Sequence, residues 1–237
     1  MDIQIILFDF GDTLVEIDPR LREESVQLIQ AYAGRPITIT DLKQAEREEW
    51  KKRTPKDFLW VQTKEDEVNY WQSFYRAVLD RLGITSHPPH LLKWLASVPT
   101  DPKSFVPFPE VKPVLDKLQE MGIALGIISN SFPSAEEILY HLELQPYFRY
   151  AVWSHRCGCG KPEWKIFHQA LSRVNFSPAH ILFLDDRVDF VKGAVKAGIR
   201  SAFWVNRNGC SDTEVQQIHS LWEIVSMVRP EPVSNEF

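Results

Sequence analysis

The sequence has few of the features that mark secreted, membrane-bound or nucleic-acid-binding proteins. Its 237 residues contain three cysteines, Cys157, Cys159 and Cys210, which are too few for the disulfide framework of a secreted domain. No stretch approaches the ~20 apolar residues that a membrane span requires, and the N-terminus shows no leader-peptide pattern. We therefore expect a cytoplasmic protein with no membrane partner.

The charge balance lacks a basic excess. Lysine and arginine number 27 against 32 aspartates and glutamates, whereas a protein that binds nucleic acid needs a basic surface to neutralise phosphates. We expect no nucleic-acid partner. A small anionic ligand is compatible with this charge, because one metal ion and one lysine can hold it. The 44% of hydrophobic residues are enough for a sizeable globular core.

Short apolar runs alternate with helical patterns over most of the chain. The first run, Ile3–Phe8, has no polar alternation and predicts a strand buried on both faces. Alternation of strands and helices predicts an α/β fold, a Rossmann-like three-layer core around a parallel sheet. The other predicted strands are Ile123–Ser129, Tyr150–Trp153, Ile181–Leu184 and Ser201–Val205, and the helices between them are Val111–Met121, Ala135–Leu142, Pro162–Val174 and Asp189–Ala197.

The segment after the first strand is different, because it has only helical patterns. We predict that residues 18–99 form an inserted, all-helical cap domain, a typical size for a small domain. Residues 1–17 and 100–228 would form the α/β core, and residues 229–237 a flexible tail. We expect a monomer or a homodimer. The predicted cap helices are Arg20–Ala33, Thr40–Arg53, Lys64–Leu82 and Pro89–Val98.

Polar residues follow three of the predicted strands at their carboxyl ends. Each alone is a common turn former or helix cap, but the carboxyl ends of parallel strands lie at one edge of a sheet. Carboxylates gathered there repel one another, so they predict a divalent cation, and ligands that are all oxygen favour Mg²⁺. The residues are Asp9 and Asp12 after the first strand, Ser129 and Asn130 at the second, and Asp185, Asp186 and Asp189 after the fourth.

Four segments resemble the ordered motifs of the haloacid dehalogenase superfamily. The resemblance covers the first strand and residues 107–205, whereas the helical segment matches by position and class only. It implies a Mg²⁺-dependent hydrolase, a phosphatase acting on a small phosphorylated metabolite, with a cap that closes over the site. The segments are FDFGDTL at 8–14, IISNS at 127–131, GKPEWKIF at 160–167 and FLDDRVDFVKGAVKAGI at 183–199.

The resemblance also implies a role for each matching residue. Asp9 would be the nucleophile, which attacks phosphorus to form an aspartyl-phosphate that water hydrolyses. Ser129 and Asn130 would bind the phosphate, and Lys161 would steady both the nucleophile and the phosphate charge. The Mg²⁺ ligands would be Asp9, the backbone carbonyl of Gly11, Asp185 and one of Asp186 and Asp189.

One position departs from the pattern of the phosphatases in this superfamily. They carry a second aspartate, the general acid and base, two residues after the nucleophile, where this chain has Gly11. Three explanations are open: Asp12 turns inward and replaces it, the leaving group is good or another acid comes from the cap, or the site binds phosphate and turns over slowly. A general acid or base contributes about 10² to 10⁴ in rate.

Two sister chemistries also lack that aspartate. Haloacid dehalogenases work without a metal and lack a double acid in the fourth motif, so Asp185 and Asp186 argue against that reaction. Phosphonatases keep Mg²⁺ and use a cap lysine as a Schiff base, so a phosphonatase-like reaction stays open.

The two clustered cysteines just before Lys161 form a Cys157-Gly158-Cys159 sequence. One further cysteine does not complete a zinc-binding set. Free thiols are the simplest interpretation, and a redox-sensitive pair is the alternative hypothesis.

Overall fold

The computed structural model describes residues 1–207, 209 and 214–228. The predicted tail, residues 229–237, lies outside them. No helix in this described part of the chain is long and apolar enough to cross a membrane.

The chain divides into two compact units. The first, the core unit, comprises Met1–Val15, Pro107–Asn130 and the described residues from Glu143 onward. The second, the helical unit, comprises Glu16–Val106 and Ser131–Leu142. The helical unit therefore includes a stretch that follows the second predicted strand, in addition to the inserted segment.

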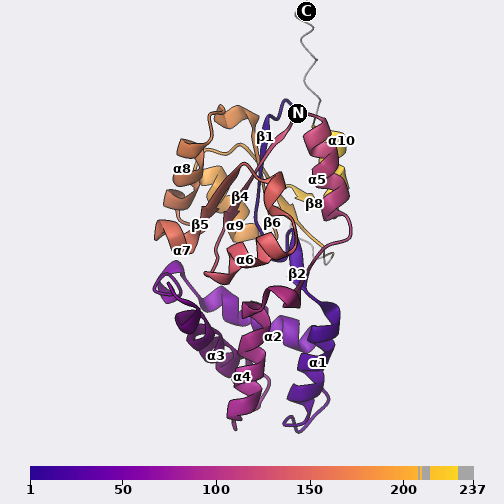
Figure 1. The fold of residues 1–237 in the computed structure, drawn as a ribbon, viewed down its shortest axis with the longest axis vertical. Helices are drawn as coiled ribbons and strands as arrows, with labels where there is room; N and C mark the ends of the chain where they lie inside the picture. Colours follow the sequence, from indigo (N-terminus) through magenta and orange to yellow (C-terminus); the bar gives the residue numbers. More distant parts are fainter. Residues whose placement is uncertain (208, 210–213, 229–237) are drawn as a thin grey trace, which may run out of the picture. The chain divides into compact units, whose positions relative to one another are not determined.

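The core unit contains a six-stranded sheet in which every neighbouring pair is parallel (Figure 1). The first strand lies in the middle and is wholly buried, as its unbroken apolar run predicts. The α/β fold with a parallel sheet is confirmed. In sheet order the strands are β5 (Tyr150–Trp153), β4 (Ala124–Ser129), β1 (Ile5–Phe8), β6 (Ile181–Asp185), β7 (Ser201–Val205) and β8 (Gln217–Ile218).

The register of the central strands brings the predicted site residues to one edge. Phe8 pairs with Ile127 of β4 on one side and with Leu184 of β6 on the other. Asp9, the next residue, donates its backbone N–H to the Leu184 carbonyl at 2.8 Å. Asp9 therefore leaves the sheet beside Asp185. The strand order reverses at β1, and α/β sheets bind ligands at such a reversal point.

Helices cover the sheet of the core unit. Helices α8 and α9 share a buried apolar cluster with Ile5, Leu7 and Phe183, while α5 packs against β4 and α10 packs on α5 (Figure 1). The helices of this unit are α5 (Val111–Glu120), α7 (Ser154–Cys157), α8 (Trp164–Arg173), α9 (Val188–Lys196) and α10 (Trp222–Met227), with 3₁₀ turns η4 (Gln145–Tyr147) and η5 (Pro178–His180).

The helical unit has clear start signals in its sequence. Thr38 and Thr63 each accept a hydrogen bond from the backbone three residues later, and the aspartates there bond back to the threonine N–H, which completes a capping box. Its helices are α1 (Pro19–Gln30), α2 (Ile39–Lys52), α3 (Lys64–Arg81), α4 (Pro89–Ser97) and α6 (Ser134–His141), with 3₁₀ turns η1 (Pro55–Asp57), η2 (Val98–Thr100) and η3 (Pro102–Ser104).

Aromatic side chains build the interior of the helical unit. Tyr70, Trp71 and Phe74 of α3 are buried together with Phe58. Phe132, which precedes α6, joins them, with its ring centroid 4.7 Å from that of Tyr70. Residues 131–142 therefore share a core with the inserted helices.

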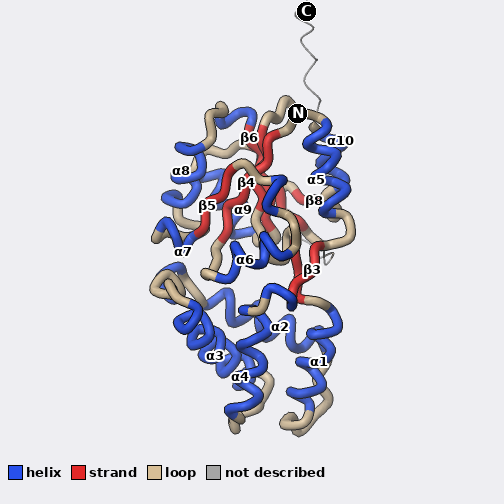
Figure 2. The backbone as a smooth tube through the Cα atoms, viewed as in Figure 1, coloured by secondary structure: helices blue, strands red, loops and turns tan. Residues whose placement is uncertain are grey.

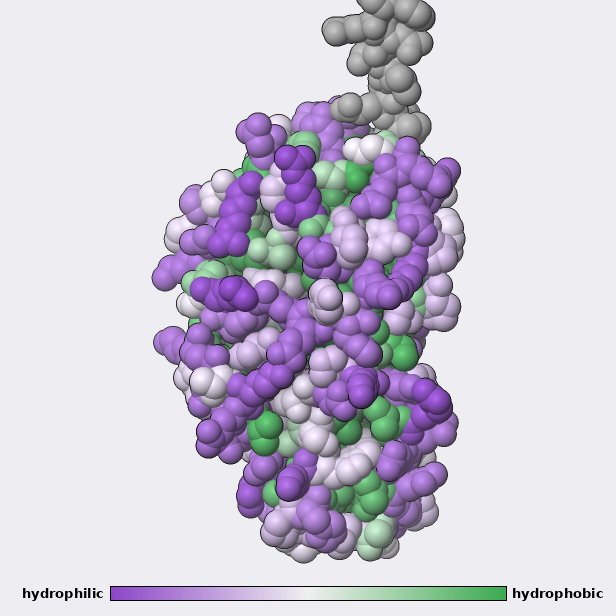
Figure 3. Space-filling model, in the orientation of Figure 1, coloured by the Kyte–Doolittle hydropathy of each residue, from purple (hydrophilic) through white to green (hydrophobic). Residues whose placement is uncertain are grey.

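Besides β8 of the large sheet, two short strands were not predicted from the sequence. They are β2 (Val15–Ile17) and β3 (Phe105–Pro107), which pair as a separate two-stranded sheet where the chain passes from one unit to the other. Figure 2 shows the other strands gathered in the core unit. The face in Figure 3 is mostly hydrophilic, in keeping with the charge content of the sequence.

Candidate functional site

The predicted nucleophile and one predicted metal ligand meet at a buried lysine. The Lys161 ammonium donates to Asp9 Oδ1 at 2.6 Å and to Asp185 Oδ2 at 2.5 Å. All three side chains are buried, and they come from the ends of β1 and β6 and from the loop before α8. The structure thus brings together residues that are 152 and 24 positions apart in sequence.

Asp186 completes a cluster of three carboxylates. Asp9, Asp185 and Asp186 each offer an oxygen within 4.8 Å of the others. The indole N–H of Trp204 on β7 donates to the Asp186 carbonyl at 2.8 Å and fixes the backbone there. Three carboxyl groups face one ammonium, so full ionisation would leave two negative charges at a site of oxygen donors. That excess and that donor set fit Mg²⁺.

Asp189 lies apart from this cluster. Its carboxylate pairs with Arg187 at 2.7 Å, and half of its side chain is exposed. The sequence left open whether Asp186 or Asp189 would be a metal ligand. The structure places Asp186 in the carboxylate cluster, whereas Asp189 forms an ion pair with Arg187.

The buried charges perturb one another. Burial raises the pKa of Asp185 to about 7, an effect that Lys161 opposes and the charge of Asp9 reinforces. Burial and then repulsion from Asp185 raise the pKa of Asp186 well above its ordinary value. Burial alone would lower the pKa of Lys161, but the charges of Asp185 and Asp9 keep it raised. Both carboxyl pKa values are shifted in the direction expected where three acids face one lysine without a further cation.

Gly11 and Asp12 occupy the loop after Asp9. No described atom lies within 4 Å of the point where a Cβ on Gly11 would stand, and its φ is not in the left-handed region. Asp12 has φ +55°, a conformation that glycine adopts without steric cost, and its N–H donates to the Val15 carbonyl at 2.7 Å. Asp12 is exposed.

Ser129 is the last residue of β4 and Asn130 follows it, as predicted, but the two side chains contact different groups. Ser129 is buried, and its Oγ lies 3.5 Å from the Asn130 carbonyl. The Asn130 amide donates to the Lys161 carbonyl at 2.9 Å and its oxygen accepts from the Lys161 N–H at 2.7 Å. The sequence predicted that Asn130 binds phosphate, whereas the structure engages its amide with the backbone of the lysine.

A further close contact lies beside Lys161. Gly193 of α9 lies so near the residue after Lys161 that a Cβ would stand 2.9 Å from Pro162 Cβ and its carbonyl oxygen. The ammonium of Lys161 also lies 4.9 Å from the ring centroid of Phe190 on the same helix. The small residue in FVKGAV is the signal in the sequence that marks this close helix packing.

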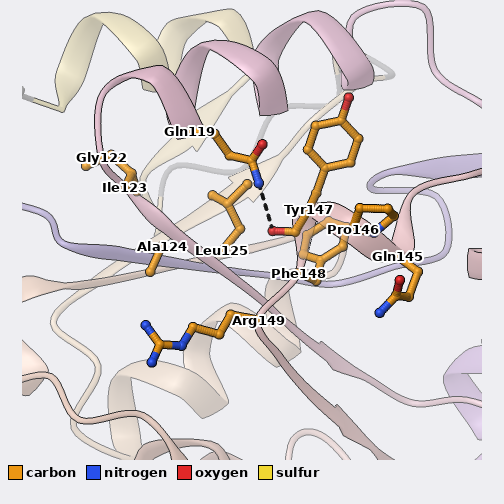
Figure 4. Close-up of a pocket in the computed structure, with 10 residues that line it drawn as sticks. All are labelled: Gln119, Gly122, Ile123, Ala124, Leu125, Gln145, Pro146, Tyr147, Phe148 and Arg149. Carbon is orange, nitrogen blue, oxygen red and sulfur yellow. Dashed lines mark hydrogen bonds between the residues drawn. The ribbon is translucent and has the colours of Figure 1, made fainter.

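A pocket at the other end of the strands is separate from these residues. Its lining includes Ala124 at the start of β4 and Arg149 just before β5. Figure 4 shows the Gln119 amide directed at the Tyr147 carbonyl and the Arg149 guanidinium directed away from both. The pocket lies at the amino ends of the strands, so it is not part of the carboxylate site.

The family model for haloacid dehalogenase-like hydrolases matches residues 3–198. The chain belongs to this family of hydrolases. A relative, the glyceraldehyde 3-phosphate phosphatase of Methanopyrus kandleri, is 28% identical over 203 residues, which are 83% of this chain and 82% of the relative.

Solved structures of haloacid dehalogenase-like proteins share the fold. The HAD-hydrolase YfnB of Bacillus subtilis, bound to magnesium, has a TM-score of 0.70 at 19% identity, covering 95% of this chain and 98% of its own. An L-2-haloacid dehalogenase of Xanthobacter autotrophicus has a TM-score of 0.68 at 17% identity, covering 97% and 100%. The fold thus serves more than one reaction, so the reaction has to be argued from the site.

Proposed function

We propose that the protein is a Mg²⁺-dependent phosphatase that hydrolyses a small phosphate monoester through an aspartyl-phosphate on Asp9. The observation that carries this proposal is the Lys161 ammonium held between Asp9 and Asp185, with Asp186 beside them. Phosphoryl transfer needs positioning and charge stabilisation more than it needs covalent chemistry. A carboxylate, a lysine and a cation site within a few ångströms supply both.

The chain's own residues have distinct tasks in this mechanism. The hydrogen bond from Lys161 orients Asp9 and leaves one carboxylate oxygen to attack phosphorus. The same ammonium neutralises charge on the transferring group. Ser129 at the end of β4 would donate its hydroxyl proton in a hydrogen bond to a phosphoryl oxygen.

The residues at the site fit a metal ion. Asp9, Asp185, Asp186 and the carbonyl of Gly11 would hold Mg²⁺, which when bound supplies positive charge to the phosphoryl oxygens. The two negative charges that full ionisation would leave beside Lys161 are the reason for this assignment.

The name of one relative supports a small substrate. The Methanopyrus kandleri protein is named for glyceraldehyde 3-phosphate, a three-carbon phosphate monoester. We propose a substrate of similar size for this chain. The carboxylate pair Asp185 and Asp186 favours phosphate over a halide, because a metal-free displacement of halide has no use for two further acids beside the nucleophile.

Gly11 favours a second candidate, a phosphate-binding protein with slow turnover. With no carboxyl at this position, the leaving group must take its proton from water, from Asp12 or from another residue.

The decisive experiment measures phosphate release from an aryl phosphate and from glyceraldehyde 3-phosphate, with Mg²⁺ and with a chelator. The enzyme should release phosphate only with metal, and Asp9→Asn should lower the rate at least ~10³-fold. Binding of Mg²⁺ and phosphate without release from any ester would establish the slow-turnover candidate. Metal-independent release of chloride from 2-chloropropionate would overturn both.

A further inference from the structure

Two thiols lie in contact immediately before the catalytic lysine in the chain. The Sγ atoms of Cys157 and Cys159 are 3.2 Å apart. Gly158 between them has φ +65° and ends the short helix α7, so the backbone turns back and brings the two side chains to the same side. A disulfide bond is ~2.05 Å long, so closing it needs an approach of about 1.2 Å.

The two thiols differ in access. Cys157 is partly buried, whereas Cys159 is buried in the apolar cluster beneath the sheet. Burial, together with the hydrogen bond to the Cys157 thiol, raises the pKa of Cys159 to about 12. An oxidant in solution therefore meets Cys157 first, and Cys159 can resolve the product because its sulfur lies 3.2 Å away, not because its thiol is acidic.

The pair is coupled to Lys161 by two peptide units. Cys159, Gly160 and Lys161 are consecutive, and the Lys161 backbone is held by two hydrogen bonds with Asn130. The Lys161 ammonium has hydrogen bonds of 2.5 and 2.6 Å to its two carboxylates. Moving Cys159 out of the core toward Cys157 would shift the segment that carries Lys161. The short contacts of the Lys161 ammonium depend on the position of that segment.

We propose that Cys157 and Cys159 form a reversible disulfide on exposure to a hydroperoxide, and that the disulfide inactivates the site by displacing Lys161. The disulfide stands on the thiol geometry alone, whereas its effect on catalysis rests on the proposed function.

The chemistry balances with a hydroperoxide as the oxidant. The Cys157 thiolate attacks the peroxide oxygen, forming a sulfenic acid and releasing hydroxide, or an alcohol from an organic hydroperoxide. The Cys159 sulfur then attacks the Cys157 sulfur, the S–O bond breaks, and the oxygen leaves as water with the Cys159 proton. Two thiols lose two hydrogen atoms in total and the peroxide is reduced. A thiol reductant reverses the reaction.

The test treats the whole protein with a small excess of hydrogen peroxide. Titratable thiols should fall from three per chain to one, and a peptide spanning both cysteines should become two hydrogen atoms lighter. Phosphatase activity should fall at least ~10-fold and return with dithiothreitol. Cys157→Ser should keep its activity through the treatment, while Cys210→Ser, the matched control, should lose it as the wild type does.

Each other outcome overturns a defined part of the proposal. A thiol count that stays at three excludes the disulfide. A disulfide that forms without loss of activity excludes the coupling to Lys161. Should the untreated protein release no phosphate, the proposed function fails, and the coupling is read from hydrogen exchange: oxidation should speed exchange at the Lys161 N–H, and unchanged exchange there would exclude the coupling.

Discussion

The side-chain amide of Asn130 makes two hydrogen bonds with the backbone of Lys161. It donates to the Lys161 carbonyl at 2.9 Å and accepts from the Lys161 N–H at 2.7 Å. The ends of β4 and the loop before α8 are thereby joined, although 31 positions separate the two residues. Asn130 is therefore a positioning residue, because it sets where the lysine side chain starts.

Replacing Asn130 should show this role in graded steps. Asn130→Ala removes both hydrogen bonds and should lower kcat/KM for phosphate release ~10- to 100-fold, as loss of outer supports does elsewhere. Asn130→Asp keeps the acceptor and loses the donor, so it should fall between the alanine variant and the wild type. Steady-state kinetics with an aryl phosphate measure the series; equal activity in all three proteins would remove the role from Asn130.

Gly11→Asp should raise turnover. No described atom within 4 Å blocks the Cβ, and the backbone there is outside the left-handed region, so the carboxyl can be added without strain. A general acid contributes about 10² to 10⁴ in rate, and we expect a gain near the lower end for an alkyl phosphate. Gly11→Asn, with the same shape but no ionisable proton, is the control. A gain in the asparagine variant of equal size would show that the acid is not responsible.

Gly193→Ala should lower activity, although the helix that carries Gly193 contributes none of the three clustered carboxylates. The new methyl group would stand 2.9 Å from Pro162, so the segment with Lys161 must shift, at a cost of about 1–3 kcal/mol. Gly34→Ala is the matched control, because no described atom lies within 4 Å of its Cβ, and stability there should hold or rise by ~0.4–1 kcal/mol. Urea unfolding and phosphate release measure both variants. Similar behaviour in the two would show that the Gly193 contact does not matter.

Glu67 should make the helical unit less stable as the pH rises. It is buried, and its carboxylate accepts from the Ser134 hydroxyl at 2.5 Å and from the Ser134 N–H at 3.0 Å. Burial raises the pKa of Glu67 despite these hydrogen bonds. The folded protein thus binds the proton more tightly than the unfolded chain, and the penalty grows from about pH 4.3, the unfolded value, up to the raised folded pKa.

Two variants of Glu67 separate charge from packing. Glu67→Gln should lose this part of the pH dependence. Glu67→Ala should lose it too, and should be about 2 kcal/mol less stable than the glutamine variant at every pH, because Ser134 loses its acceptor inside the protein. Urea midpoints between pH 4 and 8 measure both. A glutamine variant with the same slope as the wild type would contradict the assignment.

The strands of the fold were predictable because most of them are buried on both faces. The apolar runs at Ile3–Phe8, interrupted only by Gln4, and at Ile181–Leu184 became β1 and β6 with small shifts at their ends. Strands β2, β3 and β8 were missed, because two or three residues carry no periodicity. Helix α10 was missed as well, because it has only six residues.

The part of the site that lies at the ends of strands could be predicted from the sequence. Asp9, Lys161 and Asp185 meet as expected, since each follows a parallel strand. The choice between Asp186 and Asp189 depended on the first turn of α9, where Arg187 engages Asp189. The double hydrogen bond of Asn130 depends on the path of a loop, which no local pattern encodes.

The helical unit is assembled from two separate stretches of chain, and this limits how it can be exchanged. A chimaera that receives only residues 16–106 would take Glu67 without its two donors on Ser134, and Tyr70 without the ring of Phe132. Such a graft should fold poorly even with perfect junctions. A functional exchange of this unit between relatives should therefore transfer the short fragment 131–142 together with the long one, as a single module that is discontinuous in the sequence.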